Sequence, residues 1–214
     1  MWAIVVAAGV GSRFGGPKQY ETLGDRRVLD WSLAAARSVA DGVVLAVLPE
    51  RAGVPEPAAD VIVAGGTSRS ESVRAALAAV PATADVVVVH DGARPLASVA
   101  LFEAVVAAVQ AGADGAVPGL PLADTVKRVF DGVVLATLDR AELVAVQTPQ
   151  AFAAGPLRRA HSGSEAEAFW HAATDDAALV EALGGRVVVV PGEAANVKLT
   201  TPADLTTARR WLAR

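Results

Sequence analysis

The sequence predicts an α/β fold: a Rossmann-like open, mostly parallel sheet flanked by helices, with a projecting β-hairpin arm. The predicted strands are short apolar runs rich in valine, without polar alternation, which is typical of strands buried on both faces. These strands alternate with helical segments along most of the chain, and that order is typical of parallel sheets. The alternation breaks at a hairpin signal near Asp131.

Composition limits the classes of protein to consider. The chain has 214 residues, which suits a single domain over residues 1–214 with a β-arm excursion at about residues 124–146. No apolar run reaches the ~20 residues of a membrane span, and the first residues lack the form of a signal peptide. A net charge of −4 argues against nucleic acid as a partner, and the lack of cysteine excludes disulfides and thiol catalysis. We therefore expect a soluble, cytoplasmic protein.

The first predicted strand covers residues 3–8 and ends in a glycine-rich loop over residues 9–18. Glycine adopts backbone conformations that other residues avoid, and it lets a ligand approach the main chain closely. The same loop carries two cations, Arg13 and Lys18. Backbone N–H groups and two cations in one loop suit a polyphosphate.

Two well-known phosphate loops do not fit this stretch. A Walker loop needs serine or threonine after its lysine, but Gln19 follows Lys18, so there is no hydroxyl for magnesium. A dinucleotide fingerprint needs a third glycine where Phe14 stands. The remaining pattern, G-x-G-S-R followed by P-K, resembles the signature loop of nucleotidyltransferases that activate sugar and polyol phosphates.

The next elements continue the alternation of strand and helix. Asp25 is predicted to cap a helix over about residues 26–40. Two further strands are predicted at residues 43–48 and 60–64. A second glycine turn then opens another helix, because Ser68 and Glu71 have the spacing of a capping box.

Four consecutive valines at residues 86–89 give the strongest strand prediction, and they lead into the motif HDGARP. Ser98 is predicted to begin a helix that ends near residue 110, before a strand that ends at residues 116–118. In open parallel sheets, ligands bind beyond the carboxyl ends of the strands. We therefore expect one nucleotide-binding crevice, formed by the loops at residues 9–18, 65–72 and 90–95.

The pattern changes after Asp124. Residues 125–130 and 133–137 have the pattern of two strands around Asp131-Gly132, which is a strong two-residue hairpin signal. A hairpin on its own is marginally stable in water. We therefore expect an arm that projects from the sheet and is supported by a partner surface.

The C-terminal third is predicted to return to the sheet. The expected elements are a segment at residues 144–150, a helix near 152–160, a helix at 175–183 capped by Thr174, strands at 186–190 and 195–199, and a final helix from Thr201 to about residue 213. Glu165 and Glu167 are expected to mark a solvated segment, and Lys198 lies on the last predicted strand.

Several motifs taken together resemble one family. The motifs AAGVGSRFGGPKQY, GGTSRSESV, VVVVHDGARP, DTVK, VQTPQ, TDDA and NVKLT occur in the order and approximate spacing found in 2-C-methyl-D-erythritol 4-phosphate cytidylyltransferases. The resemblance covers nearly the whole chain and implies a nucleotide-diphospho-sugar transferase type of fold. It also implies transfer of a cytidylyl group from CTP to methylerythritol phosphate in non-mevalonate isoprenoid synthesis. A homodimer using Mg²⁺ or another divalent cation would carry out that reaction.

The resemblance also implies roles for individual residues. The catalytic residues would be Arg13, Lys18 and Lys198. The nucleotide would contact Ala7, Ala8, Gly9, Gly11, Gly66, Thr67, Ser72, Asp91 and Gly92, and Asp91 would also hold the metal. The acceptor would contact Arg94, Thr125, Arg140 and Thr148, with Thr125 and Arg140 supplied by the arm of a second subunit.

Other interpretations stay open at this stage. Asp91 also fits a turn cap, and Lys198 also fits a solvated surface charge. His90 suits a packed strand-end residue better than a metal ligand, and Gly92 replaces an alanine that is common in the family, which loosens the loop beside Asp91. The alternative functions are a cytidylyltransferase for ribitol 5-phosphate, a non-catalytic CTP-binding module and, more distantly, a dehydrogenase. Pyrophosphate release separates either transferase from the binding module.

Overall fold

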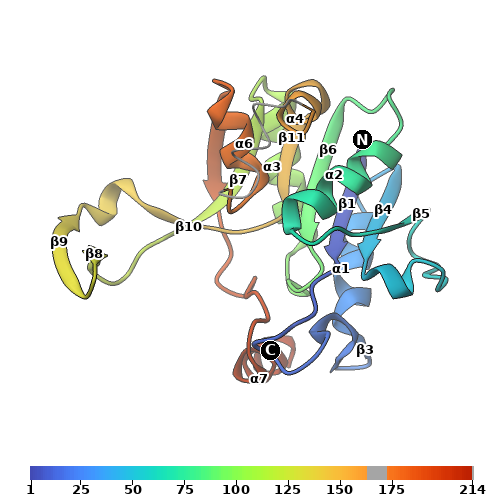
Figure 1. Ribbon diagram of the computed structural model, residues 1–214, viewed down its shortest axis with the longest axis horizontal. Coiled ribbons are helices and arrows are strands. Elements are labelled where there is room, and N and C mark those ends of the chain that lie inside the picture. Colours follow the sequence, from blue (N-terminus) through green and yellow to red (C-terminus); the bar gives the residue numbers. More distant parts are fainter. Residues whose placement is uncertain (163–172, 214) are drawn as a thin grey trace.

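The computed structural model describes residues 1–162 and 173–213, so Glu165 and Glu167 lie outside the described ranges. Within those ranges, the centre is an eight-stranded sheet in the order β10-β7-β11-β6-β1-β4-β5, with β12 paired to β7 (Figure 1). Its strands are β1 (Trp2–Ala7), β4 (Gly42–Val47), β5 (Val61–Ala64), β6 (Val86–Asp91), β7 (Gly115–Pro121), β10 (Val144–Val146), β11 (Gln150–Ala153) and β12 (Val187–Pro191).

The sheet is mostly parallel, as the apolar runs predict. Strand β1 is parallel to both β4 and β6, β4 is parallel to β5, and β12 is parallel to β7. Strand β11 lies antiparallel between β6 and β7, and β10 is antiparallel to β7. The carboxyl ends of β1, β4, β5 and β6 therefore meet at one edge of the sheet.

Helices cover both faces, which explains why the strands are apolar throughout. The helices are α1 (Val28–Arg37), α2 (Arg69–Ala79), α3 (Val99–Gln110), α4 (Ala154–Ala160), α6 (Asp176–Ala182) and α7 (Pro202–Leu212). Side chains alternate between the two faces along a strand. Accordingly, Ala3 and Val5 of β1 pack with α1 and α3, whereas Ile4 packs with α2, α4 and α6. No described helix combines the length and the apolar character that crossing a membrane requires.

A smaller apolar cluster holds the C-terminal segment under the sheet edge. Helix α7 packs there against the short hairpin of β2 (Thr22–Leu23) and β3 (Arg26–Arg27), with Leu199 fully buried in the cluster. Figure 1 shows α7 and this hairpin on the same side of the sheet. The Leu199 N–H donates to the Ala93 carbonyl at 2.8 Å, so the segment that carries Lys198 is attached to the loop after β6.

The predicted arm is present. Strands β8 (Val126–Phe130) and β9 (Val133–Leu138) pair only with each other among the described strands, and Figure 1 shows them extending away from the sheet. Asp131 and Gly132 have positive φ angles of 46° and 74°, as a two-residue type I′ turn requires. The apolar side chains of the arm are exposed, and Phe130 is 74% exposed.

Two helix starts were predicted too early. Asp25 does not cap α1, because Gly24, with a φ of 68°, turns the chain into the β2–β3 hairpin before the helix begins. The cap is Arg27, whose backbone N–H donates to the Asp30 carboxylate at 2.9 Å. Phe152 was predicted to lie in a helix, but it belongs to strand β11 and pairs with Val87 of β6. The helix therefore begins only at Ala154.

Two further corrections concern the C-terminal third. The cap of α6 is Asp175 rather than Thr174, since the Asp175 carboxylate accepts the Ala178 N–H at 3.1 Å. Residues 195–199 form no strand, because their backbone bonds to nearby turns and to the β6 loop instead of a neighbouring strand. The remaining short elements are the 3₁₀ helices η1 (Lys18–Tyr20), η2 (Pro49–Arg51) and η3 (Arg140–Glu142).

Candidate active site

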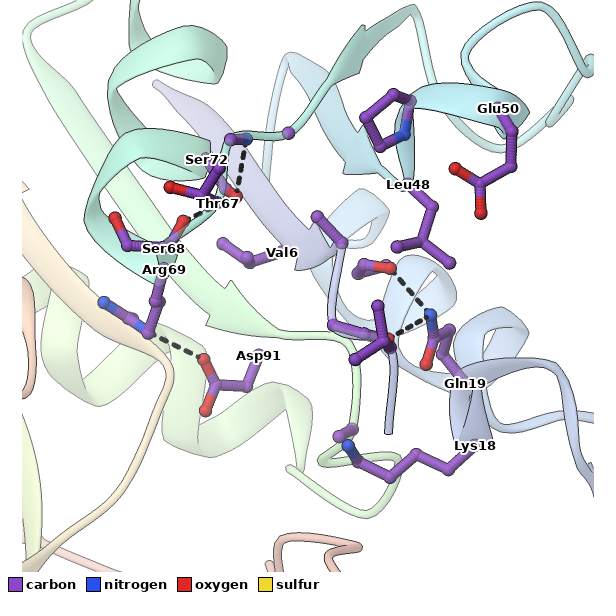
Figure 2. A pocket seen from close by; sticks show the side chains of 18 of the residues that line it. Val6, Lys18, Gln19, Leu48, Glu50, Thr67, Ser68, Arg69, Ser72 and Asp91 are labelled. Atoms are coloured by element: carbon purple, nitrogen blue, oxygen red, sulfur yellow. Dashed lines mark hydrogen bonds and ion pairs between the residues drawn. The ribbon is translucent and has the colours of Figure 1, made fainter. Parts of the chain in front are cut away.

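A cavity of about 620 Å³ lies at the carboxyl ends of β1, β4, β5 and β6. As predicted, the three loops that follow β1, β5 and β6 line it together (Figure 2). The first loop contributes Gly9 and Lys18, the second contributes the turn from Gly65 to Arg69, and the third contributes Asp91 and Ala93. The topology thus joins residues that lie far apart in the sequence into one pocket.

The first loop is closed by its own backbone. The N–H groups of Phe14, Gly15 and Gly16 all donate to the Gly11 carbonyl, at 2.9, 3.0 and 3.2 Å. These donors are therefore already used, whereas the sequence suggested that they would be free for a ligand. Gly11 has a φ of 68°, and a Cβ atom there would lie 1.8 Å from the Gly16 oxygen. Only glycine fits this position.

Gln19, which the sequence analysis treated only as a mismatch to a Walker loop, attaches the end of this loop to the end of β1. Its side-chain Nε2 donates to the Ala7 carbonyl at 2.8 Å and to the Gly9 carbonyl at 3.1 Å. The residue is almost fully buried, and Figure 2 shows both bonds. Because Gln19 follows Lys18, these bonds also fix the backbone from which the lysine side chain enters the cavity.

The cations near this loop repel one another. The pKa of Lys18 lies below its ordinary value, first because the side chain is partly buried and then because Lys198 and Arg13 are close. Asp91 opposes that shift but does not cancel it. Cations held together in this way favour a bound anion, since a polyphosphate would relieve their repulsion.

Asp91 is the acidic centre of the site. Its Oδ1 accepts from Arg69 Nε at 3.1 Å and its Oδ2 accepts from Lys198 Nζ at 2.6 Å. Arg94 Nε lies 4.0 Å from the same Oδ2. Burial raises the pKa of a carboxyl, but the charges of Arg69 and Lys198 outweigh burial and hold the pKa of Asp91 well below its ordinary value. Asp91 is therefore ionised at every physiological pH.

The second glycine turn is held in shape by helix α2. The predicted capping box is present, with the Ser68 side chain accepting from the Glu71 N–H at 3.1 Å. The Glu71 carboxylate also accepts from the Thr67 hydroxyl, and the Ser72 hydroxyl accepts from the Gly66 N–H at 3.1 Å. These bonds leave the turn rigid where it borders the cavity.

A second, smaller cavity of about 190 Å³ adjoins the first and shares Arg69, Asp91 and Lys198 with it. Arg94 and Thr148 line this second cavity. The Arg94 guanidinium donates to the Asn196 carbonyl at 2.8 Å, and the Thr148 hydroxyl accepts from the Asp91 N–H at 3.0 Å.

The structure brings most of the implied site residues to these two cavities. The larger cavity is lined by Ala7, Ala8, Gly9, Lys18, Gly66, Thr67, Ser72, Asp91 and Lys198. Gly11, Arg13 and Gly92 are not among the described residues that line either cavity, although the charge of Arg13 reaches Lys18. Gly92 is buried and its N–H donates to the Val6 carbonyl at 2.9 Å, so this loop is held firmly at Gly92.

Thr125 and Arg140 do not line either cavity of their own chain. Both are exposed on the arm, where the Arg140 guanidinium donates to the Ala123 carbonyl. His90 is fully buried and packs against the Phe102 ring, as expected of a packed strand-end residue. Its ring nitrogens bond to the Thr148 hydroxyl and the Arg94 carbonyl.

Sequence reasoning missed Arg69. It lines both cavities and pairs with Asp91 and with Asp176, which lies 107 residues further along the chain. The motif GGTSRSESV contains Arg69, and its position at the start of a helix bordering a phosphate loop was the available signal. Glu50, which follows β4, also lines the larger cavity.

A glycine-rich loop over a cation-lined cavity, with a smaller cationic cavity alongside, is the arrangement of a nucleotidyltransferase. The family model described as 2-C-methyl-D-erythritol 4-phosphate cytidylyltransferase matches residues 1–214. The chain belongs to this family, which confirms the resemblance that its motifs suggested.

Individual relatives agree with the family match. The chain is 42% identical to the 2-C-methyl-D-erythritol 4-phosphate cytidylyltransferase of Syntrophotalea carbinolica, covering 99% of this chain and 96% of the relative. It is 43% identical to the bifunctional enzyme IspD/IspF of Clavibacter michiganensis, but it spans only 54% of that relative's length. Its fold is similar to the crystal structure of the cytidylyltransferase of Thermus thermophilus, with a TM-score of 0.83, 37% identity and coverage of 99% and 98% of the two chains.

Proposed function

We infer that this chain transfers a cytidylyl group from CTP to 2-C-methyl-D-erythritol 4-phosphate, releasing pyrophosphate, in isoprenoid precursor synthesis. The observation that carries this function is the family match over residues 1–214. The two adjoining cavities support it, because the larger one suits a nucleoside triphosphate and the smaller one suits a phosphorylated acceptor. A cytoplasmic location, where the enzyme would meet CTP, is part of the proposal.

The chemistry needs charge stabilisation rather than a general base. An anionic phosphate oxygen of the acceptor attacks the α-phosphorus of CTP, a new P–O bond forms, and the bond to the β-phosphate oxygen breaks as pyrophosphate leaves. The main barrier is repulsion between anions, so positioned cations lower it. In the proposal, Lys18 and Arg13 hold the triphosphate, with Arg13 swinging towards the cavity, and Lys198 contacts the α-phosphate.

Lys198 is suited to this step because it lies beside both cavities, where it now pairs with the Asp91 carboxylate. Its side chain is 43% exposed, so it is free to turn from Asp91 towards a phosphate. Arg69 remains on Asp91 when Lys198 leaves, which keeps the buried carboxylate compensated.

A divalent cation fits the residues present, provided that the nucleotide supplies most of its ligands. The described residues hold no group of three metal-ligating side chains. Mg²⁺ commonly binds one or two carboxylates together with substrate phosphates, and the ionised Asp91 carboxylate lines both cavities. Asp91 would hold the ion once Lys198 has turned away, and the ion would neutralise charge on the triphosphate.

The acceptor site is proposed to be shared between two subunits. Arg94 and Thr148 line the smaller cavity of the same chain, whereas Thr125 and Arg140 lie on the projecting arm. An arm that reaches a second copy would carry both residues to that copy's acceptor cavity and bury its exposed apolar side chains, including Phe130. The active unit in this proposal is a homodimer.

The test is pyrophosphate release from CTP and Mg²⁺ with either methylerythritol phosphate or ribitol 5-phosphate. We expect release with methylerythritol phosphate and a loss of roughly 100-fold or more in Arg13→Ala, as removal of one charge-stabilising contact commonly causes. Release only with ribitol 5-phosphate would contradict the acceptor assignment. CTP binding without release with either acceptor would indicate a binding module instead.

A further inference from the structure

Arg69 lies in the wall that separates the two cavities. It is the first residue of α2, and it lines both the larger and the smaller cavity. Its Nε donates to Asp91 Oδ1 at 3.1 Å and its Nη1 donates to Asp176 Oδ2 at 2.7 Å. The guanidinium is therefore held from two sides by carboxylates on different elements. Figure 2 shows the side of this arrangement that faces the pocket, with Arg69 joined to Asp91.

Asp176 holds Arg69 from behind. It is the first residue of α6, is fully buried, and is not among the described residues that line either cavity. Its second oxygen, Oδ1, accepts from His161 Nε2 at 3.0 Å. Burial alone would raise the pKa of Asp176, but the charge of Arg69 and the His161 hydrogen bond lower it below its ordinary value. Asp176 is thus a buried carboxylate whose charged form Arg69 favours, and it is not among the described residues that line either cavity.

Two anchors fix a guanidinium in a way that one anchor does not. Bonds from Nε to one carboxylate and from Nη1 to another define the plane and the rotation of the group. If the Asp176 charge were removed, Arg69 would keep only Asp91 and would be free to form a closer, bidentate pair with it. Such a pair would also occupy Asp91 Oδ2, the oxygen that Lys198 Nζ now contacts at 2.6 Å and that has to stay available when Lys198 turns away.

We propose that Asp176, itself held by His161, is a positioning residue for nucleotidyl transfer. It fixes Arg69 in the wall between the cavities, so that Asp91 keeps its orientation towards the cavities when Lys198 turns to the nucleotide. This inference rests on the proposed function, because the step that it serves is the transfer reaction. It extends that function with a residue that contacts neither substrate.

A double-mutant cycle on kcat/KM tests this role. We expect Asp176→Asn, which keeps the shape and removes the charge, to lower kcat/KM by about 10- to 100-fold, by analogy with the loss seen when the hydrogen-bond partners of metal ligands are removed. In an Arg69→Gln background, the same substitution should change kcat/KM by less than about 2-fold, because no guanidinium is left to position. Equal losses in both backgrounds would indicate a purely structural role and overturn the proposal.

A matched control comes from α1. Asp30 also lies in the first turn of a helix and pairs with an arginine, with Arg27 Nε 3.0 Å from Asp30 Oδ2, but it is not among the described residues that line the cavities. We expect Asp30→Asn to leave kcat/KM unchanged even where it lowers the melting temperature. If Asp176→Asn does not fold, His161→Phe, which removes the other bond to Asp176, takes its place in the cycle.

A readout that needs no activity separates this inference from the proposed function. The ¹⁵N resonance of the Arg69 Nε–H group, assigned by its absence in Arg69→Gln, should be sharp and slowly exchanging in the wild type and in Asp30→Asn. It should broaden or shift in Asp176→Asn. An unchanged resonance would overturn the positioning role, whereas an inactive wild type with the expected resonances would overturn the proposed function alone.

Discussion

The carbonyl of Gly11 determines the shape of the first loop, because three N–H groups of that loop donate to it. We predict that Gly11→Ala abolishes this shape, since its φ is 68° and the new Cβ would lie 1.8 Å from the Gly16 oxygen. Steady-state kinetics should show a loss of kcat/KM of about 100-fold or more, comparable to removing a charge-stabilising contact, because Lys18 lies at the end of the same loop.

Gly16 in the same loop provides the control. It has no positive φ, and a Cβ atom there would meet nothing within 4 Å. Gly16→Ala should therefore leave kcat/KM within about 2-fold of the wild type, because surface substitutions away from special features usually change the free energy of unfolding very little. Similar losses in both variants would show that the loop is sensitive to any added side chain and that Gly11 has no special conformational role.

His90 makes the stability of the fold depend on pH. Burial lowers the pKa of His90 to about 4 in the folded protein, against an ordinary value of 6.5 in the unfolded chain. Between these values the unfolded chain binds a proton that the folded protein does not. The contribution of His90 to the free energy of unfolding is therefore complete above pH 6.5 and falls as the pH drops towards 4. The contribution of His90 to this fall approaches about 1.4 kcal/mol per pH unit.

Urea unfolding at pH 5 to 7 checks this dependence. The free energy of unfolding should decrease with falling pH in the wild type and much less steeply in His90→Gln, which has no titrating ring. The aspartates with lowered pKa values, such as Asp91 and Asp176, lose their contribution only below about pH 4, near their ordinary value, so they do not obscure the comparison. Parallel slopes for the two proteins would contradict the assignment to His90.

The sequence was informative about individual residues where the signal was local. Glycines and cations lie together in the first loop, and the structure places Gly9 and Lys18 at one cavity. Arg69 was missed because its importance comes from two carboxylates that lie 22 and 107 residues away. Pairings over such separations depend on the tertiary fold, and no spacing rule in a single sequence indicates them.

The same distinction holds for helices and strands. The helix after Ser68 and the turn at Asp131-Gly132 were predicted correctly, because capping boxes and type I′ turns are formed by neighbouring residues. The strand at residues 195–199 was wrong, because an apolar run becomes a strand only where another strand is available to pair with it. Helix α1 began late because β3 first pairs with β2.

The arm exposes large apolar side chains to solvent when the chain is considered alone. Phe130 and Val133 are 74% and 62% exposed, and an isolated hairpin has little stability of its own. We predict that the double variant Phe130→Lys, Val133→Lys shifts the proposed dimer to monomer and removes transferase activity, while CTP still binds. Sedimentation velocity and isothermal titration calorimetry measure the two effects.

Val54 offers a control for this substitution. It is 39% exposed in the connector after η2, away from the arm, so Val54→Lys adds the same charge to an apolar surface position. The Val54 variant should remain a dimer with normal activity. A double variant of the arm that stays dimeric and active would show that the arm does not form the subunit contact.

At the scale of the whole molecule, the proposed site residues are divided between the two cavities and the arm. Residues of this chain line both the larger cavity and the smaller one. Thr125 and Arg140 are outside both cavities, on an element that points away from the sheet (Figure 1). In the proposed dimer, each acceptor site is therefore completed in trans, and each subunit gives one arm and receives one.

This arrangement predicts complementation between two inactive variants. Lys18→Ala disables the nucleotide cavity of its own chain, and Arg140→Ala disables the acceptor site of the neighbouring chain. In a mixed dimer, one site then carries both defects and the other carries neither. Random exchange makes about half of the dimers mixed, and one of the two sites in each mixed dimer is intact, as two-fold symmetry requires. About a quarter of all sites are then intact, so two proteins that are each inactive should together give about a quarter of the activity of the same amount of wild type.

Pyrophosphate release after co-refolding equal amounts of the two variants measures this recovery. Each variant refolded alone is the control, and Lys18→Ala refolded with a Lys18→Ala, Arg140→Ala double variant should recover nothing, because every site then lacks Lys18. If Arg140 served the site of its own chain, each mixed dimer would carry one defect in each site and activity would stay at the level of the separate variants. The size of the recovery thus distinguishes an arm that acts on its neighbour from one that folds back on its own subunit.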